Sequence, residues 1–427
     1  MTSQLIAIAI FVAAFAIANL RGVHLGVVMF AAACGVGLFL ADMSVEAVLE
    51  GFPIAIMVLL AGVTFFFAIA QANGTIDALI GKALGRVGDN AAILPFVLFA
   101  LTAGISAMGS PLSSLMMAPI GMPIAKRYGI DPMLMALAIG SGLSAGAFAP
   151  TSLFGIVTRG VAQRAGVELD PLALFAVAVI ANFVLFAIGF LMFGGPGLAS
   201  RRDVLASPAV ATASSRSAAP LPARFTTRQI VTLSSIVGLL VVVIGASLAG
   251  TTSDIGVLCF AFGAVLSLVD PPSARIAVSK IDWSTVLLVG GIVTFVGVLQ
   301  SMGAVDMVGK AATRLGVPIL TALAICFIGA LVSAFASTTG ILAALVPLAL
   351  PLVASGEVAG WALLSALAVC SSIVDVSPFS TSGATLIATA AEEDRPRLTS
   401  LLTRWGLAMI VIGPIVLVAV LVLPSAR

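Results

Sequence analysis

The sequence predicts an all-α membrane protein that crosses the bilayer several times and is built from two similar halves. Of its 427 residues, 61% are hydrophobic and only 9% are charged, and the mean hydropathy is +1.23. Soluble domains carry about 25% charged residues, so this composition excludes an ordinary water-soluble fold. A short proline-containing motif also occurs twice, at residues 150–155 and again at residues 378–383. Together these observations predict two repeated sets of transmembrane helices.

Ten apolar segments are long enough to span a bilayer, which takes about 20 helical residues. Each half of the chain has five, and the fourth segment of each half is long and interrupted. In the first half they lie near residues 4–20, 23–41, 54–72, 131–165 and 171–195. In the second half they lie near residues 229–249, 253–270, 283–301, 359–391 and 403–425. The first 20 residues have no basic leading segment, so we expect no cleaved signal peptide.

Two further apolar segments, residues 91–127 and 317–353, have small polar residues at their centres. The first centre reads Gly109-Ser110-Pro111-Leu112-Ser113-Ser114, and the second reads Ser337-Thr338-Thr339-Gly340. The helices on either side of each centre are short, so we interpret the segments as re-entrant hairpins; two full spans in each is the alternative. Each half then has five spans and one hairpin, and the odd number of spans inverts the second half relative to the first.

Residues 196–228 form the predicted linker between a first repeat, residues 1–195, and a second repeat, residues 229–427. The linker is rich in Ser, Ala and Pro, carries five arginines and has no long apolar run, which is typical of a flexible tether. Cytoplasmic loops carry an excess of Lys and Arg, and most of the 20 basic residues fall on the linker's side. We therefore expect a cytoplasmic (inner) membrane protein with a cytoplasmic linker and both termini outside.

The two halves also share sequence outside the motif, at an offset close to 228 residues. The matched pairs are Val58–Gly62 with Val286–Gly290, Gly81–Gly88 with Gly309–Gly316, and Pro119 and Pro123 with Pro347 and Pro351. A fixed period of this kind indicates an internal repeat. The Lys and Arg of the second pair recur on opposite sides of the membrane, where an amphipathic helix in each interface would place them.

The repeated motif interrupts the fourth span of each half. Proline and glycine at membrane depth expose backbone groups that are tolerated only where protein or a water-filled cavity covers them. Paired breaks in two repeats are a pointer to the binding site of a transporter. We therefore predict that the hydroxyls at the breaks bind substrate: Thr151, Ser152, Ser380 and Thr381. Small hard cations prefer oxygen ligands. We therefore predict that backbone oxygens at the breaks bind the coupling cation, for example in a Na⁺ site. These residues are Phe148, Ala149, Pro150, Val376, Ser377 and Pro378.

Asp375 is the one acid of 18 that falls well inside a predicted span. An ionisable residue inside the membrane is rare and is a functional hypothesis by default. Its repeat-related residue is Ala147, so the two breaks differ in charge. We interpret Asp375 as a ligand for a coupling cation or a carrier of a transferred proton. The alternative is that it caps the broken helix or bonds to neighbouring serines.

The hairpin centres offer hydroxyl groups beside the starts of helices. The candidate substrate-binding residues there are Ser110, Ser113, Ser114, Ser337, Thr338 and Thr339. A helix N-terminus presents N–H groups and the positive end of the helix dipole, so two opposed tips can hold an anion without Lys or Arg. The alternative is that these hydroxyls only cap helices or bond to their own backbone.

The sequence gives little support for enzyme activity, nucleic-acid binding or a metal site formed by cysteines. There is no P-loop and no arrangement of a nucleophile with a base, so we expect no enzyme activity. The basic residues are confined to predicted loops, which gives no reason to expect nucleic-acid binding. Cys34, Cys259, Cys326 and Cys370 lack metal-ligand spacing and are interpreted as small buried hydrophobic residues. No cofactor is expected apart from a coupling cation, Na⁺ or H⁺.

Residues 146–155 and 377–384 resemble the signature segments of MatC-type dicarboxylate (malonate) carriers. Residues 67–75, Phe-Ala-Ile-Ala-Gln-Ala-Asn-Gly-Thr, are also similar to that family. The family belongs to the ion-transporter superfamily, in which the divalent-anion:sodium symporters are better-understood relatives. The resemblance extends over nearly the whole chain and is strongest in residues 54–195 and 283–390.

The resemblance implies a homodimer in which a scaffold domain holds a mobile transport domain that moves as an elevator. The hairpins and broken spans would form the transport domain. In the sodium symporters a Ser-Asn-Thr triplet at each hairpin tip contacts the substrate carboxylates and frames the cation sites. Here the second tip reads Ser337-Thr338-Thr339, with Thr in place of Asn, and the first matches less well. The coupling ion is therefore left open between Na⁺ and H⁺.

The sequence thus predicts a secondary transporter of small dicarboxylates, of the malonate or C4-dicarboxylate class, working by cation-coupled symport. Two alternatives are the membrane subunit of a tripartite carrier that needs an extracytoplasmic binding protein, and a cation/proton antiporter of the same superfamily. A third is a membrane-embedded accessory protein without transport activity. Two repeat-related broken helices argue against that last class, since a purely structural bundle has no use for them.

Overall fold

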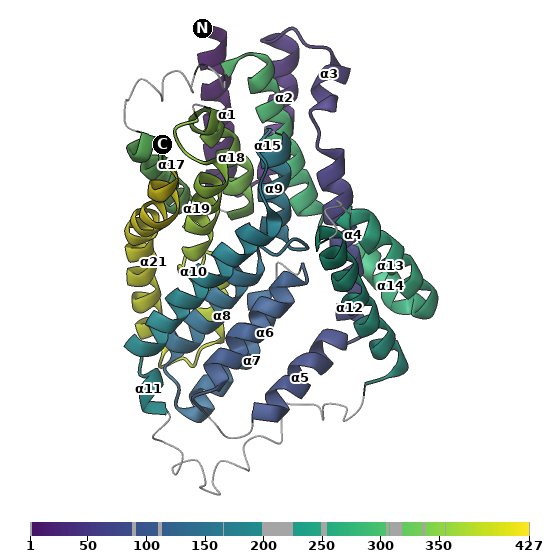
Figure 1. Cartoon of the computed structure of the whole chain (residues 1–427), viewed down its shortest axis with the longest axis vertical. Helices are drawn as coiled ribbons and strands as arrows, with labels where there is room; N and C mark the ends of the chain where they lie inside the picture. Colours follow the sequence, from purple (N-terminus) through teal and green to yellow (C-terminus); the bar gives the residue numbers. More distant parts are fainter. Residues whose placement is uncertain are drawn as a thin grey trace, which may run out of the picture.

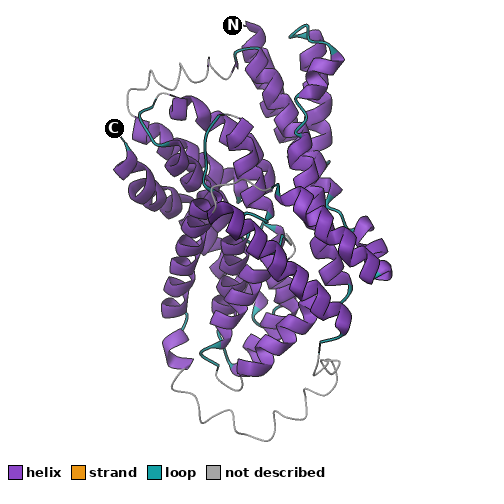
Figure 2. Ribbon diagram, turned by 45° about the vertical axis from the view of Figure 1, so that its right-hand side comes forward, coloured by secondary structure: helices purple, strands orange, loops and turns teal. Residues whose placement is uncertain are grey.

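Helices account for most of the residues that the structure describes, and no strand occurs among them (Figure 2). The computed structural model describes residues 2–87, 91–109, 113–164, 166–198, 225–248, 254–304, 307, 318–334, 338–354 and 356–426. Most of the predicted linker, residues 199–224, lies outside these ranges. The linker's predicted limits of 196 and 228 also overlap helices, because α11 ends at Leu198 and α12 begins at Thr227.

The first half of the chain places a helix at each apolar segment. Its helices are α1 (Thr2–Arg21), α2 (Leu25–Phe39), α3 (Val45–Glu50), α4 (Ile54–Ala72), α5 (Thr75–Val87), α6 (Leu94–Ala107), α7 (Ser113–Tyr128), α8 (Pro132–Gly146), α9 (Leu153–Arg164), α10 (Pro171–Met192) and α11 (Gly195–Leu198). The long segment predicted at 131–165 is divided into α8 and α9. Segment 91–127 forms α6 and α7, whose connection at 110–112 is outside the described residues.

The second half repeats this order of elements. Its helices are α12 (Thr227–Leu248), α13 (Ile255–Val269), α14 (Pro271–Ser279), α15 (Trp283–Ser301), α17 (Pro318–Ser333), α18 (Thr338–Ala354), α19 (Gly360–Ile373), α20 (Thr381–Thr389) and α21 (Arg395–Leu417), which continues as a π-helical turn, η3 (Val418–Val422), and a 3₁₀ turn, η4 (Leu423–Ser425). The last helix therefore begins at Arg395, eight residues before the start of the predicted span 403–425. The short helices α3, α11 and α14 were not predicted from hydropathy.

Four described helices are long and apolar enough to cross a membrane. They are α4, α10, α15 and the continuous helical segment Arg395–Ser425. Seven shorter apolar helices of 10–17 residues accompany them, α2, α8 and α19 among them. This content of apolar helices fits the predicted multi-pass membrane protein.

The helices pack in two groups. Figure 1 shows the outer helices of the two groups on opposite sides, α13 and α14 at the right and α19 and α21 at the left. The flank group consists of α1–α4 and α12–α15, and the hairpin group consists of α6–α11 and α17–α21. Within the flank group α2 packs along α15, and α4 packs along α13. Within the hairpin group α8 packs between α6 and α10, and α19 packs against α17 and α21. Helix α5 connects the two groups in the first half, since it leads from α4 toward α6.

Glycines bring the helices of the flank group into backbone contact. A Cβ atom added to Gly291 of α15 would lie 1.9 Å from the carbonyl oxygen of Gly26 in α2. A Cβ atom added to Gly62 of α4 would lie 2.5 Å from the carbonyl oxygen of Gly256 in α13. Small residues that let helix backbones approach are the usual device of membrane helix packing. Each contact joins a helix of the first half to a helix of the second, so the halves are interleaved.

The hairpin group is joined across the two halves as well. The Ser144 hydroxyl of α8 donates to the carbonyl of Ser372 in α19 at 3.1 Å, and these two residues are 228 positions apart. At one end of the group Arg397 pairs with Asp131 at 2.6 Å, and Lys126 pairs with Glu393. The Lys126 ammonium, as hydrogen-bond partner, holds the pKa of the Glu393 carboxyl below its usual value. Asp131 also accepts from the Met133 N–H at the start of α8.

Candidate functional site

The two broken spans lose their helical hydrogen bonds at residues 147–152 and 374–380. Pro150 and Pro378 lack an N–H and cannot continue the helices. Gly155 and Gly383 sit in the first turn of the next helix, against the unwound backbone. A Cβ atom added to Gly155 would lie 2.4 Å from the carbonyl oxygen of Ala149, and one added to Gly383 would lie 2.0 Å from that of Ser377. The motif therefore needs glycine at this position because the unwound chain folds back over it.

The first break is fastened to the end of α6. The Thr151 hydroxyl donates to the Ala107 carbonyl at 2.6 Å, and the Ser152 hydroxyl donates to the Ser106 carbonyl at 2.7 Å. Both side chains are buried. Carbonyls in the last turn of a helix have no partner within the helix, so these hydroxyls cap α6. Their protons are then not free to donate to a substrate carboxylate in this conformation.

The second break is fastened to the other predicted hairpin through Asp375. The Thr338 hydroxyl at the start of α18 donates to Oδ1 of Asp375 at 2.5 Å. The same hydroxyl lies 2.8 Å from the hydroxyl of Ser333, at the end of α17. The Ser377 hydroxyl donates to the Ala334 carbonyl at 2.9 Å. No ion pair reaches Asp375 among the described residues, so a hydroxyl is the partner of this carboxyl group.

Two repeat-related pairs of carbonyls at the breaks remain open. The Ala149 carbonyl accepts from the Ser152 N–H at 2.8 Å, and the Ser377 carbonyl accepts from the Ser380 N–H at 3.1 Å. No hydrogen bond among the described residues ends on the carbonyls of Phe148, Pro150, Val376 or Pro378. Of the carbonyls predicted as cation ligands, these four keep their full capacity for a cation.

The start of α7 carries a buried hydroxyl without a partner. The side chain of Ser113 is fully buried, and its Oγ forms no hydrogen bond with any other atom of the described chain. Next to it, the Ser114 hydroxyl donates to the Ser382 hydroxyl at 3.0 Å. Ser382 lies in the first turn of α20, so this bond brings the N-termini of two helices from different halves together. The related pair of helices, α18 and α9, also pack on each other.

Gly109, just after α6, lies close to both α4 and the first break. Its φ of +82° is one that residues with a Cβ atom rarely adopt. An added Cβ would also lie 2.5 Å from a methyl group of Val63 in α4 and 2.9 Å from the Thr151 carbonyl oxygen. The end of α6 is therefore pressed between α4 and the first break.

The remaining predicted residues take different roles. The Ser380 hydroxyl accepts from the Gly383 N–H at 3.0 Å and faces the carbonyls of Asp375 and Ser377, so it caps α20. Thr381 is exposed, and Pro150 and Pro378 are half-buried. Ser110 and Ser337 lie outside the described residues, and of Thr339 only the backbone is described.

Sequence reasoning did not select Ser382 or Ser333, which complete these contacts. Ser382 stands inside the second copy of the motif, where the first copy has Phe154. A polar residue in the first turn after a break, where its repeat mate is apolar, is the signal that could have identified it. Ser333 has no such signal, because it is one serine in an apolar helix.

Residues 1–147 match the family model of the N-terminus of the dicarboxylate carrier protein MatC. The resemblance to MatC-type carriers is thereby confirmed over these residues, which include the segment 67–75. Among solved structures, the chain is similar to the YdaH transporter of Alcanivorax borkumensis, with 13% sequence identity and a TM-score of 0.60. The similarity covers 88% of this chain and 86% of that one. No curated protein matches the chain.

Taken with the apolar helices, the family match identifies a multi-pass membrane transporter and not an enzyme. The likeness to YdaH, at this low identity, concerns the fold alone. The fold shared with YdaH covers 88% of the chain and so continues well beyond residue 147, where the family match ends.

Proposed function

We propose that this protein is a secondary transporter of small dicarboxylates in the cytoplasmic membrane, coupled to the entry of Na⁺ or H⁺. The observation that carries the proposal is the fully buried, unpartnered hydroxyl of Ser113 at the start of α7, beside the Ser114–Ser382 bond. An unsatisfied buried hydroxyl costs about 1–3 kcal/mol, and a ligand that accepts its proton removes this cost. The family match supplies the substrate class.

The electrostatics of the two tips favour one end of the site for a substrate carboxylate. At the start of α18, the Thr338 hydroxyl is already bonded to a protein carboxylate, that of Asp375. At the start of α7, no acidic residue of the described chain bonds to Ser113 or Ser114. Helix N-termini attract anions, so α7 and α20 would bind one carboxylate of the substrate. The second carboxylate would extend toward the N-termini of α9 and α18, two helices that pack on each other.

The cation would bind on the Asp375 side of the same site. The oxygens at the second break are the carboxyl group of Asp375, the open carbonyls of Val376 and Pro378, and the carbonyl of Ser377. The first break would contribute the carbonyls of Phe148, Ala149 and Pro150. An all-oxygen set suits a hard cation. Occupancy by Na⁺, or protonation of Asp375, would offset the negative charge that a dianionic substrate brings into the membrane.

Transport would proceed by movement of the hairpin group against the flank group, as an elevator. The flank group would be the scaffold and would form the contact between two protomers of a homodimer. In this arrangement the two repeats, residues 1–195 and 229–427, are inverted in the membrane and each supplies one hairpin and one broken span to the moving part.

The test compares Ser113→Ala with Ser365→Ala in purified protein. Ser365 of α19 is the matched control, since its hydroxyl is also buried and unpartnered but lies in the middle of a helix. Neither change should lower the unfolding midpoint. A ligand that binds the native state raises that midpoint by mass action, so malonate and succinate are titrated with Na⁺, with K⁺ and at low pH.

We expect dicarboxylates to stabilise the wild type and Ser365→Ala equally. Ser113→Ala should bind them about 10–100-fold more weakly, because a hydrogen bond to a charged group contributes about 1.5–3 kcal/mol. Equal affinities in both variants would overturn the site assignment. Wild-type protein in liposomes that takes up no dicarboxylate would overturn the function, and cation flux without any organic anion would point to an antiporter.

A further inference from the structure

We propose that Gln229 and Gln4 are positioning residues that clamp the ends of α4 and α15, each to the first helix of the opposite half. The inference rests on the proposed function, because it concerns how the moving hairpin group is held by the flank group. Neither residue touches the candidate substrate or cation site. We call the two contacts the glutamine clamps.

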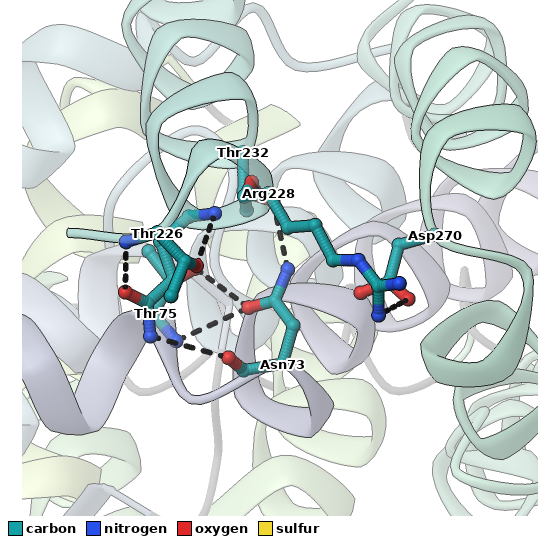
Figure 3. Close-up of polar contacts among 7 residues, drawn as sticks. Asn73, Thr75, Thr226, Arg228, Thr232 and Asp270 are labelled. Atoms are coloured by element: carbon teal, nitrogen blue, oxygen red, sulfur yellow. Dashed lines mark hydrogen bonds and ion pairs between the residues drawn. The ribbon is translucent and has the colours of Figure 1, made fainter.

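The first clamp joins α12 to the end of α4 (Figure 3). The Nε2 atom of Gln229 donates to the carbonyls of Asn73 and Gly74, at 3.3 Å each. The Asn73 carbonyl follows the last residue of α4, where helical partners are missing, and the Gly74 carbonyl also accepts from the Ala78 N–H of α5 at 3.0 Å. Gln229 is buried. Gly74 has a φ of +72°, the left-handed conformation that commonly ends a helix. The chain turns at this glycine from α4 into α5.

A second contact reinforces the first clamp. The Asn73 Nδ2 atom donates to the Thr232 hydroxyl of α12 at 2.8 Å. The Asn73 Oδ1 atom accepts from the Thr75 N–H at 3.1 Å and from its hydroxyl at 2.6 Å, which caps the start of α5. One asparagine side chain therefore joins the beginning of α5 to α12, as Figure 3 shows.

The second clamp is the counterpart in the other half. The Nε2 atom of Gln4 in α1 donates to the carbonyl of Met302 at 2.7 Å, directly after α15. Gly303 follows with a φ of +69°, and the Gln4 Nε2 atom would lie 3.3 Å from a Cβ atom added there. In both halves, then, a glutamine near the start of the first helix binds the end of the third predicted span of the other half. A contact repeated in this way is unlike an isolated surface hydrogen bond.

The position of the first clamp gives it a mechanical role. Helix α5 is the segment between the flank group and α6, the first helix of the hairpin group. Any displacement of the hairpin group must therefore bend the chain somewhere between α4 and α6. With Asn73, Gly74 and Thr75 all bonded to α12 or to one another, the bend cannot occur at Gly74. The clamp fixes the direction in which α5 leaves the flank group and moves the bend beyond α5.

The start of α12 is itself anchored, so that it can serve as a fixed point. Arg228 pairs with Oδ1 of Asp270, between α13 and α14, at 3.1 Å. The Thr226 hydroxyl accepts from the Gln229 N–H at 3.3 Å, and the Gln229 Oε1 accepts from the Thr226 N–H at 3.0 Å. This reciprocal pair is a capping box. Gln229 thus uses its oxygen to cap α12 and its nitrogen to hold α4.

That division allows a substitution that separates the two roles. Gln229→Glu keeps an oxygen acceptor for the Thr226 N–H, and glutamate is favoured at this place in a capping box. It replaces the donor that faces two carbonyls with an acceptor, which opens the clamp. Gln4→Glu does the same in the other half, where the side chain forms no cap. Gln300→Glu is the control, because this exposed residue near the end of α15 undergoes the same chemical change without a clamp.

The experiment measures dicarboxylate uptake into liposomes at saturating substrate, together with the substrate-induced rise of the unfolding midpoint. We expect Gln229→Glu and Gln4→Glu each to slow uptake by about tenfold, because residues that guide a moving segment affect turnover. Their dissociation constants for substrate should stay within about twofold of the wild type, and Gln300→Glu should be normal in both. If Gln229→Glu does not fold, Gln4→Glu carries the test.

Two results would overturn the inference. Uptake by both variants at the wild-type rate would show that the clamps do not guide movement. Loss of substrate binding in parallel with uptake would show a general structural defect. Wild-type protein that neither binds nor transports dicarboxylates is a separate outcome, which refutes the proposed function on which the inference rests.

Discussion

Gly383 offers the most direct test of how the second broken span is built. Replacing it with alanine places a Cβ atom 2.0 Å from the carbonyl oxygen of Ser377, 2.6 Å from the Ser377 carbonyl carbon and 2.8 Å from the carbonyl oxygen of Val376. All three atoms belong to the backbone, so no side chain can rotate away. Ordinary contact begins at 3.4 Å, and the Ser377 carbonyl must therefore retreat by 1.4 Å (3.4 minus 2.0 Å).

This displacement is large for a packed interior, where overpacking typically costs about 1–3 kcal/mol. We expect Gly383→Ala to reach the upper end, about 3 kcal/mol. Gly155→Ala should cost less, about 2 kcal/mol, because its nearest contact is 2.4 Å from the Ala149 oxygen. Gly383→Ala should also abolish uptake, because the displaced residues adjoin Asp375.

The assay is thermal unfolding of the purified variants in detergent, with uptake into liposomes as the second measurement. Gly104→Ala is the control, since a Cβ atom there meets nothing within 4 Å. It lies inside α6, where exchange of glycine for alanine stabilises by about 0.4–1 kcal/mol. If Gly383→Ala unfolds at the same temperature as Gly104→Ala and transports normally, the unwound chain does not pack over the glycine as described.

Two further substitutions probe the polar contacts. Thr338→Val removes the hydroxyl bound to Asp375 at nearly constant volume. We expect a loss of about 1.5–3 kcal/mol in stability together with impaired uptake. The control is Thr102→Val, whose lost hydroxyl bonds only to its own helix, and equal unfolding midpoints for the two variants would contradict this expectation. Glu393→Gln removes the exposed pair with Lys126, and its effect should be small and disappear in about 1 M salt. Because the pKa of Glu393 is lowered in the folded protein, the contribution of the pair is present above the ordinary glutamate value of about 4.3 and is lost as the pH falls through the lowered value. The unfolding midpoints of wild type and variant should therefore converge in acid, and a difference that grows there would refute the pairing.

The positions of the helices were accessible from the sequence because they follow from local properties. Apolar runs locate α4 and α15, and the proline and glycine of the repeated motif locate the breaks before α9 and α20. The short helix α3 was missed because its six residues carry two acids and no apolar run. It is defined instead by the Ser44 hydroxyl, which accepts from the Ala47 N–H at 3.2 Å.

The hydrogen-bond partner of each hydroxyl could not be predicted from the sequence in the same way. Thr151, Ser152 and Ser113 look alike in the sequence, since each lies beside a helix start in an apolar region. What separates them is the neighbour: carbonyls at the end of α6 face the first two residues, and nothing of the described chain bonds to the third. Such contacts join residues about 45 positions apart or more, and no local pattern records them. Gln229 is a similar case, because it reads as the last part of a capping box, while its partner carbonyls follow α4.

The glycine contacts of the flank group have a consequence for synthesis of the protein. Gly26 of α2 has its partner in Gly291, 265 residues later in the chain (291 minus 26). At a translation rate of about 5–20 residues per second, roughly 13–53 s pass before that partner emerges from the ribosome. During this time the groove beside Gly26 on α2 can face only lipid or another membrane protein, and the groove beside Gly62 on α4 does so until its partner Gly256 emerges. A nascent chain that stops after α12 lacks both α13 and α15, and it leaves these grooves open in the bilayer.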